Sequence, residues 1–424
     1  MVRVSGPLAG AALDAVAGAP RPAPRHAALR RFIARDGAEI DRGLALWFPA
    51  PASFTGEDCA EFQGHGGPAV IAALADTLTA LGLRPAVAGE FTRRAFENGR
   101  MDLTEAEGLA DLIDAETEGQ REQALAQMTG ALRQLYDEWR EQLIMVLAAL
   151  EGEIDFPDED DVPDHLSQTA GEPLDTLIAA LGEHLDDNRR GERVRDGFVV
   201  ALIGAPNAGK SSLLNALARR DAAIVTDIPG TTRDVLEVRL VLGGFPVILA
   251  DTAGLREAAD TIEAEGIRRA LARAEAADLR LGVVDVSRET SPPVIARLRS
   301  GDALVLNKTD LAAGAGIMTA DDIDRFEISA KTGAGISAVE AWLCDTATAR
   351  LSRREAPALS RARHRLAVSR ALDHLTTARH RLLDAPELAS AEVHQALRAL
   401  ETLTGRVDVE DVLDRVFSQF CIGK

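Results

Sequence analysis

The segment Gly204–Ser211 reads G-A-P-N-A-G-K-S, the order of glycines, lysine and hydroxyl that is typical of phosphate-binding loops. Glycines allow backbone N–H groups to surround phosphate oxygens, and the start of a following helix adds positive potential. Lys210 can reach the β and γ phosphates of a nucleotide, and the Ser211 hydroxyl can bind Mg²⁺. An apolar run precedes the segment and a helical stretch with Leu213, Leu214 and Leu217 follows it. The sequence therefore predicts a nucleoside triphosphate site.

Three further segments bear on the nucleobase. Asp251–Gly254 reads D-T-A-G after an apolar run, where the aspartate can support a magnesium shell and the glycine amide can contact a γ phosphate. Asn307–Asp310 reads N-K-T-D, and its last carboxylate can accept two hydrogen bonds from guanine that adenine does not offer. Ser329–Lys331 reads S-A-K and closes the base pocket. Together these segments resemble the guanine-specificity elements of P-loop GTPases, so we expect GTP and not ATP.

The expected nucleotide contacts come from the phosphate loop, a first switch, the D-T-A-G segment and the base loops. They are Asn207, Ala208, Gly209, Lys210, Ser211, Ser212, Thr226, Asp227, Ile228, Pro229, Gly230, Thr231, Thr232, Asp251, Thr252, Ala253, Gly254, Asn307, Lys308, Asp310, Ser329, Ala330 and Lys331.

The first switch carries a threonine-rich segment, Thr226–Asp234, where a threonine normally completes the Mg²⁺ shell. Leu255 follows the D-T-A-G segment at the position where signalling GTPases place a glutamine that orients the attacking water. The sequence therefore predicts that this enzyme orients its water and neutralises transition-state charge by other groups.

Four apolar runs near residues 198–203, 247–250, 281–284 and 303–306 alternate with helical stretches, which predicts a parallel, doubly wound sheet covered by helices. Helical periodicity occurs on both sides of this α/β segment, with apolar residues recurring at three- and four-residue steps. We therefore expect a discontinuous helical domain with the nucleotide-binding domain inserted into it. Residues 1–98 mix short apolar runs with Gly and Pro turns, as in a small α+β domain.

Five segments outside the nucleotide loops resemble the MnmE (TrmE) family of tRNA-modifying GTPases. They are Ser53–Asp58, Gln63–Gly67, Gly89–Phe91, Ile154–Pro157 and the terminal Phe420–Lys424. The resemblance covers nearly the whole chain. It implies a tetrahydrofolate-binding and dimerisation domain over residues 1–98, helical segments over 99–191 and 349–424, and a GTPase domain over 192–348.

The resemblance also implies cofactors and partners. The family forms homodimers and joins a flavoprotein of the MnmG (GidA) type, which carries FAD, in a heterotetramer. With that partner it adds an aminomethyl-type group to carbon 5 of the wobble uridine, U34, of certain tRNAs. The cofactors implied are GTP, Mg²⁺, K⁺ and 5-formyltetrahydrofolate or a related one-carbon tetrahydrofolate.

Residue roles follow by matching the family's motifs to this sequence. Potassium would be bound by Asn207, Thr226, Ile228 and Thr231, and magnesium by Ser211 and Thr232. Glu263 matches the carboxylate that orients the water, and Cys421 matches a cysteine needed for tRNA modification. The folate positions are Arg3, Glu61, Arg100 and Lys424. Family members carry additional residues before the segment that begins here at Val2.

Without the resemblance, several of these residues have ordinary explanations. Glu263 lies in a charged helical stretch, Cys421 could be a small buried side chain, and His65 lies in a Gly-rich turn. The main alternative function is a GTPase switch in ribosome assembly. Such proteins usually carry a basic RNA-binding module after the GTPase domain, whereas the segment after Arg350 ends in acidic helical sequence.

Composition sets the remaining limits. The formal charge of −20 argues against nucleic-acid binding by bulk electrostatics, although it leaves room for a local patch or a partner. Three distant cysteines form no disulfide framework, and no apolar run is long enough to span a bilayer, so we expect a cytoplasmic protein. Only four of the 47 basic residues are lysines, and three of these lie in the nucleotide motifs, where a guanidinium does not replace an ammonium.

Overall fold

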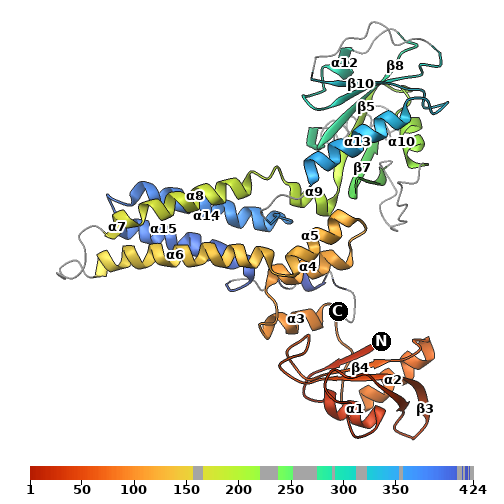
Figure 1. Ribbon diagram of the computed structural model, residues 1–424, viewed down its shortest axis with the longest axis vertical. Coiled ribbons are helices and arrows are strands. Elements are labelled where there is room, and N and C mark those ends of the chain that lie inside the picture. Colours follow the sequence, from red (N-terminus) through yellow and green to blue (C-terminus); the bar gives the residue numbers. More distant parts are fainter. Residues whose placement is uncertain are drawn as a thin grey trace, which may run out of the picture. The chain divides into compact units, whose positions relative to one another are not determined.

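The computed structural model describes residues 1–155, 166–219, 237–251, 275–288, 292–311, 322–352 and 357–407, together with residues 413, 416–418 and 420. The chain forms two compact units. The first consists of Met1–Ile113, Ala126–Ile178 and Arg370–Lys424, and the second of Asp114–Leu125 and Ala179–Ser369. Figure 1 shows both in sequence colours. Within the described ranges, no helix is long and apolar enough to cross a membrane.

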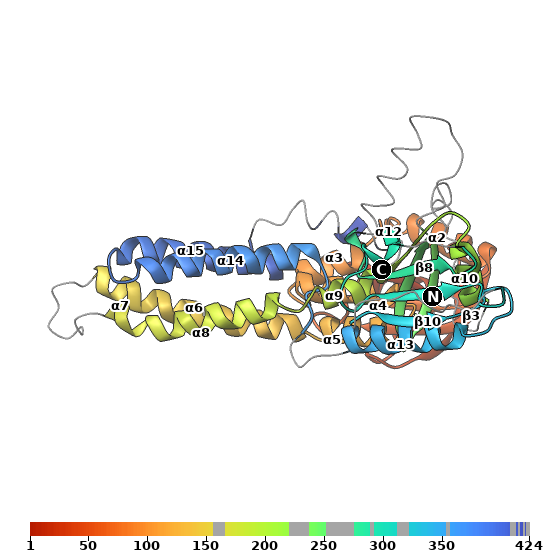
Figure 2. The same cartoon turned by 90° about the horizontal axis from the view of Figure 1, so that it is seen from above.

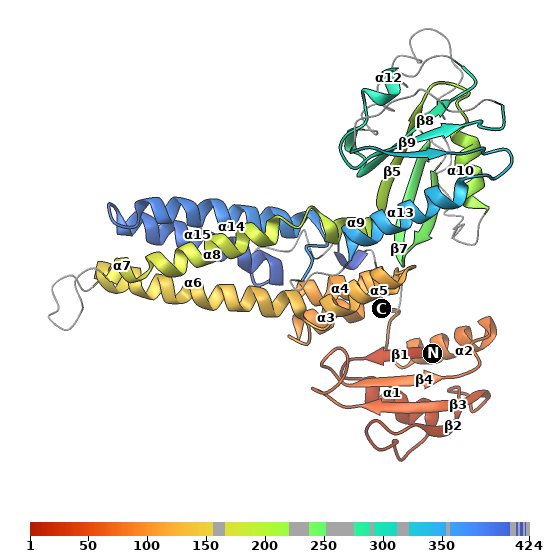
Figure 3. The same ribbon diagram turned by 45° about the horizontal axis from the view of Figure 1, so that its top comes forward.

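The first unit begins with an antiparallel four-stranded sheet. Its strands are β1 (Val2–Ser5), β2 (Ala28–Ile33), β3 (Glu39–Phe48) and β4 (Cys59–Gln63), in the order β1-β4-β3-β2. Helices α1 (Ala9–Ala17) and α2 (Pro68–Ala80) supply apolar side chains to a core on one face of the sheet, where Phe32 and Phe62 meet edge to face. The expected α+β unit is therefore present (Figure 3).

Helices make up most of the remaining described residues of the first unit. They are α3 (Glu90–Glu97), α4 (Leu103–Ile113), α6 (Ala131–Asp155), α7 (Leu166–Thr169) and α15 (Pro386–Thr404), with parts of α5 (Glu118–Met128), α8 (Gly171–Leu185) and α14 (Ala362–Arg381). In Figures 1 and 2, α6 and α15 run side by side although they are far apart in sequence. The apolar residues of α6 that are buried recur at three- and four-residue steps, as expected for this segment; they are Leu132, Tyr136, Trp139, Leu143, Val146, Leu147 and Leu150.

The second unit contains a six-stranded sheet. Its strands are β5 (Phe198–Gly204), β6 (Glu237–Leu242), β7 (Phe245–Asp251), β8 (Leu279–Asp285), β9 (Ala303–Asn307) and β10 (Asp324–Glu327), in the order β10-β9-β8-β5-β7-β6. Helices α9 (Arg190–Asp196), α10 (Lys210–Ala218) and α13 (Ile336–Leu351) pack on one core, while α12 (Pro292–Ile295) belongs to apolar clusters that include Ala201 and Ile203. This is the predicted doubly wound arrangement.

Two strands of this sheet were not predicted from the sequence. The edge strand β6 runs antiparallel to β7, and β10 adds a short strand at the other edge. A two-residue turn, Gly243 and Gly244, joins β6 to β7, and both glycines have positive φ angles, 59° and 83°. Such a turn favours a hairpin because its twist matches that of the flanking strands. The Gly-Gly pair was therefore a signal that the sequence did contain.

Candidate nucleotide and folate sites

The phosphate loop connects the carboxyl end of β5 to the first residue of α10, as the motif predicts. Its backbone takes conformations that side chains rarely allow, since Asn207 and Gly209 have φ angles of 65° and 97°. A Cβ atom on Gly209 would lie 2.0 Å from the Asn307 side-chain nitrogen. Glycine at this position therefore permits both the turn and the close approach of the base loop.

Lys210 is almost fully buried, with 3% of its surface exposed. Its Nζ donates hydrogen bonds to the carbonyl oxygens of Gly204 (2.9 Å) and Ala205 (3.0 Å). These bonds hold the ammonium against the phosphate loop, where a bound phosphate would lie. An ammonium in this position provides a concentrated positive charge among backbone N–H groups. The arrangement suits a polyphosphate.

Ser211 and Asp251 come together although they are far apart in sequence. The Ser211 hydroxyl donates to Asp251 Oδ2 at 2.6 Å, and Asp251, the last residue of β7, is 1% exposed. β5 and β7 are parallel neighbours, which brings the residues that follow them to the same edge of the sheet. Hydroxyl and carboxylate oxygens are the donors that Mg²⁺ prefers. The described residues therefore fit the oxygen chemistry of a magnesium site.

Asn307 links the base loop to both neighbouring loops. Its Nδ2 donates to the Ala208 carbonyl oxygen (2.9 Å), and its Oδ1 accepts from the Ala330 N–H (3.0 Å). Ser329 then donates from its hydroxyl to Asp310 Oδ1 (2.7 Å). Three segments that the sequence predicted as separate nucleotide contacts thus form one hydrogen-bonded group. Lys331, Ser212 and Asp310 are exposed around it.

Several predicted nucleotide residues lie outside the described residues. These are the switch positions Thr226, Asp227, Ile228, Pro229, Gly230, Thr231 and Thr232, the residues Thr252, Ala253 and Gly254, and the proposed water-orienting Glu263. The same holds for Cys421 and Lys424 at the C-terminus.

Two of the predicted folate residues are in direct contact. Arg3 on β1 faces Glu61 on β4 across the antiparallel ladder, and their side chains form an ion pair at 2.9 Å. The Arg3 guanidinium also lies over the Phe54 ring at 5.2 Å and the Phe91 ring at 5.7 Å. Cations and flat π systems attract each other at such distances. This corner of the sheet combines charge with flat surfaces, which suits a pterin-like ring.

Arg100 approaches the same part of the chain. A Cβ atom on Gly56 would lie 3.2 Å from Arg100 Cγ, so the arginine side chain crosses directly beside the loop that follows Phe54. Arg3 and Arg100 therefore both border the segment Ser53–Glu57. Arg3 contacts the Phe54 ring, and Arg100 passes beside Gly56. Arg3 and Glu61 are therefore in direct contact, whereas Arg100 approaches them only by way of this loop.

A polar network beside this loop was not predicted from the sequence. Glu57 accepts hydrogen bonds from Ser5 Oγ and Arg94 Nη1, both at 2.9 Å. Arg94 continues to Glu90, which also binds Arg84. Hydrogen bonds from Arg84, together with those from Val87 and Arg94, outweigh burial and lower the pKa of Glu90 to about 2. The Ser53–Asp58 and Gly89–Phe91 motifs were the signal, because each contributes one of these carboxylates.

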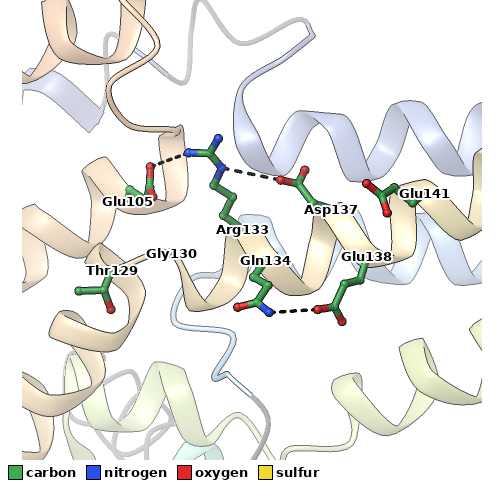
Figure 4. A pocket seen from close by; sticks show the side chains of 8 residues that line it. All are labelled: Glu105, Thr129, Gly130, Arg133, Gln134, Asp137, Glu138 and Glu141. Atoms are coloured by element: carbon green, nitrogen blue, oxygen red, sulfur yellow. Dashed lines mark hydrogen bonds and ion pairs between the residues drawn. The ribbon is translucent and has the colours of Figure 1, made fainter. Parts of the chain in front are cut away.

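A separate pocket of about 400 Å³ lies in the first unit, where α4 approaches the turn between α5 and α6 (Figure 4). Arg133 spans it, with ion pairs to Glu105 at 3.4 Å and to Asp137 at 3.7 Å. Glu138 and Glu141 add further carboxylates, and Figure 4 shows Gln134 reaching Glu138. An acidic pocket of this kind repels phosphates, so it does not compete with the phosphate loop as a nucleotide site.

Comparison with known proteins gives matches along the entire chain. A family model described as the MnmE helical domain matches residues 103–421, and a model described as the GTP-binding protein TrmE N-terminus matches residues 1–100. The tRNA modification GTPase MnmE of Maricaulis maris is 64% identical over 425 residues, covering 100% of this chain and 96% of the relative. The protein of the same name from Parvibaculum lavamentivorans is 56% identical with the same coverage.

The chain belongs to the MnmE family of tRNA modification GTPases. It is accordingly a GTP hydrolase that binds GTP, and the full-length match favours the tRNA-modification hypothesis over a ribosome-assembly switch. The combination of a TrmE N-terminal domain, a helical domain and a doubly wound GTPase sheet confirms the predicted fold class.

Solved structures match parts of this MnmE-family chain. The G domain of the Thermotoga maritima FeoB iron transporter has a TM-score of 0.26 and 25% identity, covering 35% of this chain and 98% of that chain. A GTP-binding protein from Sulfolobus solfataricus in complex with GDP has a TM-score of 0.27 and 16% identity, covering 50% and 67%. At these TM-scores the family assignment rests on the sequence relatives.

Proposed function

We propose that this chain hydrolyses GTP in a magnesium- and potassium-dependent reaction that serves modification of the wobble uridine of tRNA at carbon 5. Nucleotide binding is supported above all by Asn307, whose side chain links the phosphate loop to the loop at Ala330. That network holds the guanine-recognition loop in register with the phosphate loop. A nucleotide could therefore bind along one edge of the sheet.

Guanine would be recognised by Asp310, whose Oδ1 is already oriented by Ser329 at 2.7 Å. An orienting hydrogen bond fixes the carboxylate so that its remaining lone pairs face one direction, and adenine offers no matching donor pair. Lys210 would neutralise the β and γ phosphates. The remaining contacts are those predicted from the sequence, from Asn207 through Ser212, Thr226 through Thr232, Asp251 through Gly254, and at Asn307, Lys308, Ser329, Ala330 and Lys331.

Magnesium would be held by Ser211 and Thr232, with Asp251 behind the Ser211 hydroxyl at 2.6 Å. Potassium would be held by Asn207 and by oxygens of Thr226, Ile228 and Thr231. Asn207 suits this role because its side chain carries an amide oxygen and is exposed within the phosphate loop. Both cations would supply positive charge where negative charge develops during phosphoryl transfer. Glu263 would orient the attacking water in place of the glutamine that Leu255 replaces.

The first sheet would bind a one-carbon tetrahydrofolate. The supporting observation is the combination of Arg3, Glu61 and two phenylalanine rings at one corner, with Arg100 beside the adjoining loop. Lys424 would complete the site, and Cys421 would act in the modification reaction itself. We further propose that the protein acts as a homodimer, binds tRNA and assembles with an FAD-containing partner of the MnmG type.

The test is a separation of the two activities. In cells whose only copy carries Cys421→Ser, we expect wobble-uridine modification to be lost, as measured by mass spectrometry of tRNA nucleosides. The purified variant should keep the GTP hydrolysis rate of the unsubstituted protein, because the cysteine lies outside every predicted GTP contact. Normal modification in this strain would contradict the proposed role of Cys421. Unmodified tRNA is also expected from a strain that lacks the whole gene, and modified tRNA there would contradict the proposed function.

A further inference from the structure

Asp285 is a buried carboxylate at the nucleotide edge of the sheet that the sequence did not single out. It is the last residue of β8, and the parallel ladder places it directly opposite Asn307, the last residue of β9. The ladder continues one step beyond, because the Val286 N–H donates to the Asn307 carbonyl oxygen at 3.1 Å. Asp285 is therefore fixed relative to the start of the base loop by main-chain hydrogen bonds.

Both oxygens of the Asp285 carboxylate accept hydrogen bonds from neighbouring residues. Oδ1 accepts hydrogen bonds from the Ser287 N–H (3.0 Å) and the Ser287 hydroxyl (2.6 Å). Oδ2 accepts from Lys308 Nζ at 2.6 Å. Ser287 therefore sets the orientation of the carboxylate, and the oriented carboxylate then binds the lysine of the base loop.

Burial reduces the solvent screening of the ion pair between Asp285 and Lys308. The Asp285 side chain is 8% exposed and the Lys308 side chain 30% exposed. Burial alone would raise the pKa of Asp285, but the hydrogen bonds from Lys308 and Ser287 together outweigh it, so the pKa lies below its ordinary value. Arg288 is a second cation near Asp285, but its Nε lies 3.8 Å from Oδ2 and its side chain is 71% exposed, so solvent screens it far more strongly.

Lys308 also needs an anchor because of its backbone. Its φ angle is 68°, in the left-handed region that non-glycine residues rarely occupy. Such a conformation persists only where surrounding contacts fix it. The backbone contacts nearby are Thr309 N–H to the Ile328 carbonyl (3.1 Å) and Leu311 N–H to the Lys308 carbonyl (2.9 Å). Asp285 is the partner that holds the side chain.

We propose that Asp285, oriented by Ser287, is a positioning residue for guanine-nucleotide binding that acts through Lys308. The inference rests on the proposed assignment of Asn307–Asp310 as the guanine-recognition loop. The ion pair holds the lysine stem beside the base site before the nucleotide arrives, so less side-chain freedom is lost on binding. It explains why this position keeps one of the four lysines, since a compact ammonium fits between the carboxylate and the loop whereas a planar guanidinium has a different geometry.

The experiment is a double-mutant cycle on equilibrium binding of fluorescent GDP to the full chain, using Asp285→Ala, Lys308→Met and both together. A hydrogen bond to a charged group has a strength that corresponds to about tenfold in affinity, so each single variant should bind GDP about tenfold more weakly. The double variant should bind no more weakly than Lys308→Met alone, because Asp285 acts only through the lysine. At saturating GTP, kcat of Asp285→Ala should remain unchanged while KM rises.

Asp302→Asn is the matched control. Asp302 is a similarly buried aspartate, 5% exposed, but it precedes β9 and so lies at the amino end of that strand. Its carboxylate accepts hydrogen bonds from the backbone N–H groups of Arg280 and Arg299. The substitution should lower the thermal unfolding midpoint without weakening GDP binding. Additive losses in the cycle, or an Asp285→Ala variant that loses stability but keeps its GDP affinity, would overturn the inference. Unchanged affinity in Lys308→Met would instead overturn the assignment of the guanine loop.

Discussion

The side-chain amide of Asn307 uses both of its ends, and this decides the local geometry of the nucleotide site. Its nitrogen holds the phosphate loop and its oxygen holds the loop at Ala330. With 2% of its surface exposed, the amide has no water to replace a lost partner. The neighbouring Asn207 differs, because it is exposed within the phosphate loop and is left to interact with a ligand.

That difference leads to a prediction on potassium. We expect GTP hydrolysis by the unsubstituted protein to be about tenfold or more faster in potassium than in sodium buffer, equivalent to a lowering of the barrier by ~1.4 kcal/mol. Sodium is the smaller ion and should not fill the proposed site. Asn207→Ala should abolish the difference while retaining GTP binding. Steady-state rates in matched chloride buffers provide the measurement, and equal turnover of the unsubstituted protein in both salts would contradict the prediction.

Helix α4 begins with two reciprocal hydrogen bonds between Asp102 and Glu105. The Asp102 carboxylate accepts from the Glu105 N–H at 2.8 Å, and the Glu105 carboxylate accepts from the Asp102 N–H at 2.7 Å, which forms a reciprocal capping box. Asp102 is only 9% exposed and its Oδ2 has no hydrogen-bond partner among the described residues. Burial raises the pKa of Asp102 to about 6.

This shift predicts how stability depends on pH. Because the pKa is raised on folding, the folded state binds the extra proton between the ordinary pKa of 3.8 and about 6, and stability is lost as pH rises through that window. Asp102→Asn keeps the capping oxygen and removes the buried charge, so it should stabilise the protein at pH 8 by on the order of 1–3 kcal/mol. The gain should vanish below pH ~4, where Asp102 is protonated in both states.

Thermal unfolding midpoints at several pH values give the measurement. The turn residue Asp36 provides a control because its side chain is exposed and accepts from the Ala38 N–H, so Asp36→Asn should show no comparable gain at pH 8. A destabilised Asp102→Asn variant at pH 8 would mean that the carboxylate charge stabilises the start of α4 more than its burial destabilises it.

In the molecule as a whole, the second unit contains its own core and every predicted nucleotide-binding residue that the structure describes. The core of this unit includes Val194 of α9, which precedes the first strand of the sheet, and Leu351 of α13, which follows the last strand. The core therefore depends on helices that flank the sheet in the sequence. Within the same unit, Arg365 near the start of α14 binds Asp187 and Glu192, which joins the chain segments that enter and leave the nucleotide-binding sheet. The segment Asp114–Leu125 adds hydrogen bonds such as Gln120 to the Arg195 carbonyl.

We therefore expect a fragment of residues 179–369 to fold cooperatively and to bind GDP with an affinity within about tenfold of the full chain, a difference of ~1.4 kcal/mol. A fragment of residues 198–351 should be less stable, because it lacks α9 and the Arg365 ion pairs. Circular dichroism melts and fluorescent-GDP titrations would compare the two. Equal stability of both fragments would show that these flanking contacts do not support the nucleotide-binding sheet.

From the sequence alone we could predict the nucleotide motifs, the alternating strands and helices of the GTPase unit, and the helical periodicity on either side of that unit. These features are local, because a phosphate loop or a helix face depends on spacing within a few turns of chain. The family resemblance was carried by motifs such as Ser53–Asp58, whose place in the fold could not be read from spacing. The three-domain division stays a prediction, while the chain itself forms two units.

Which distant residues meet depends on the tertiary structure. The ion pair of Asp285 with Lys308, the link from Ser211 to Asp251 and the contact of Arg3 with Glu61 each join residues that belong to different elements or loops. Their partners follow from strand order and register, which long-range packing sets and single-sequence periodicity does not contain. Asp285 looked like one acidic residue among 67 until β8 and β9 placed it opposite Asn307.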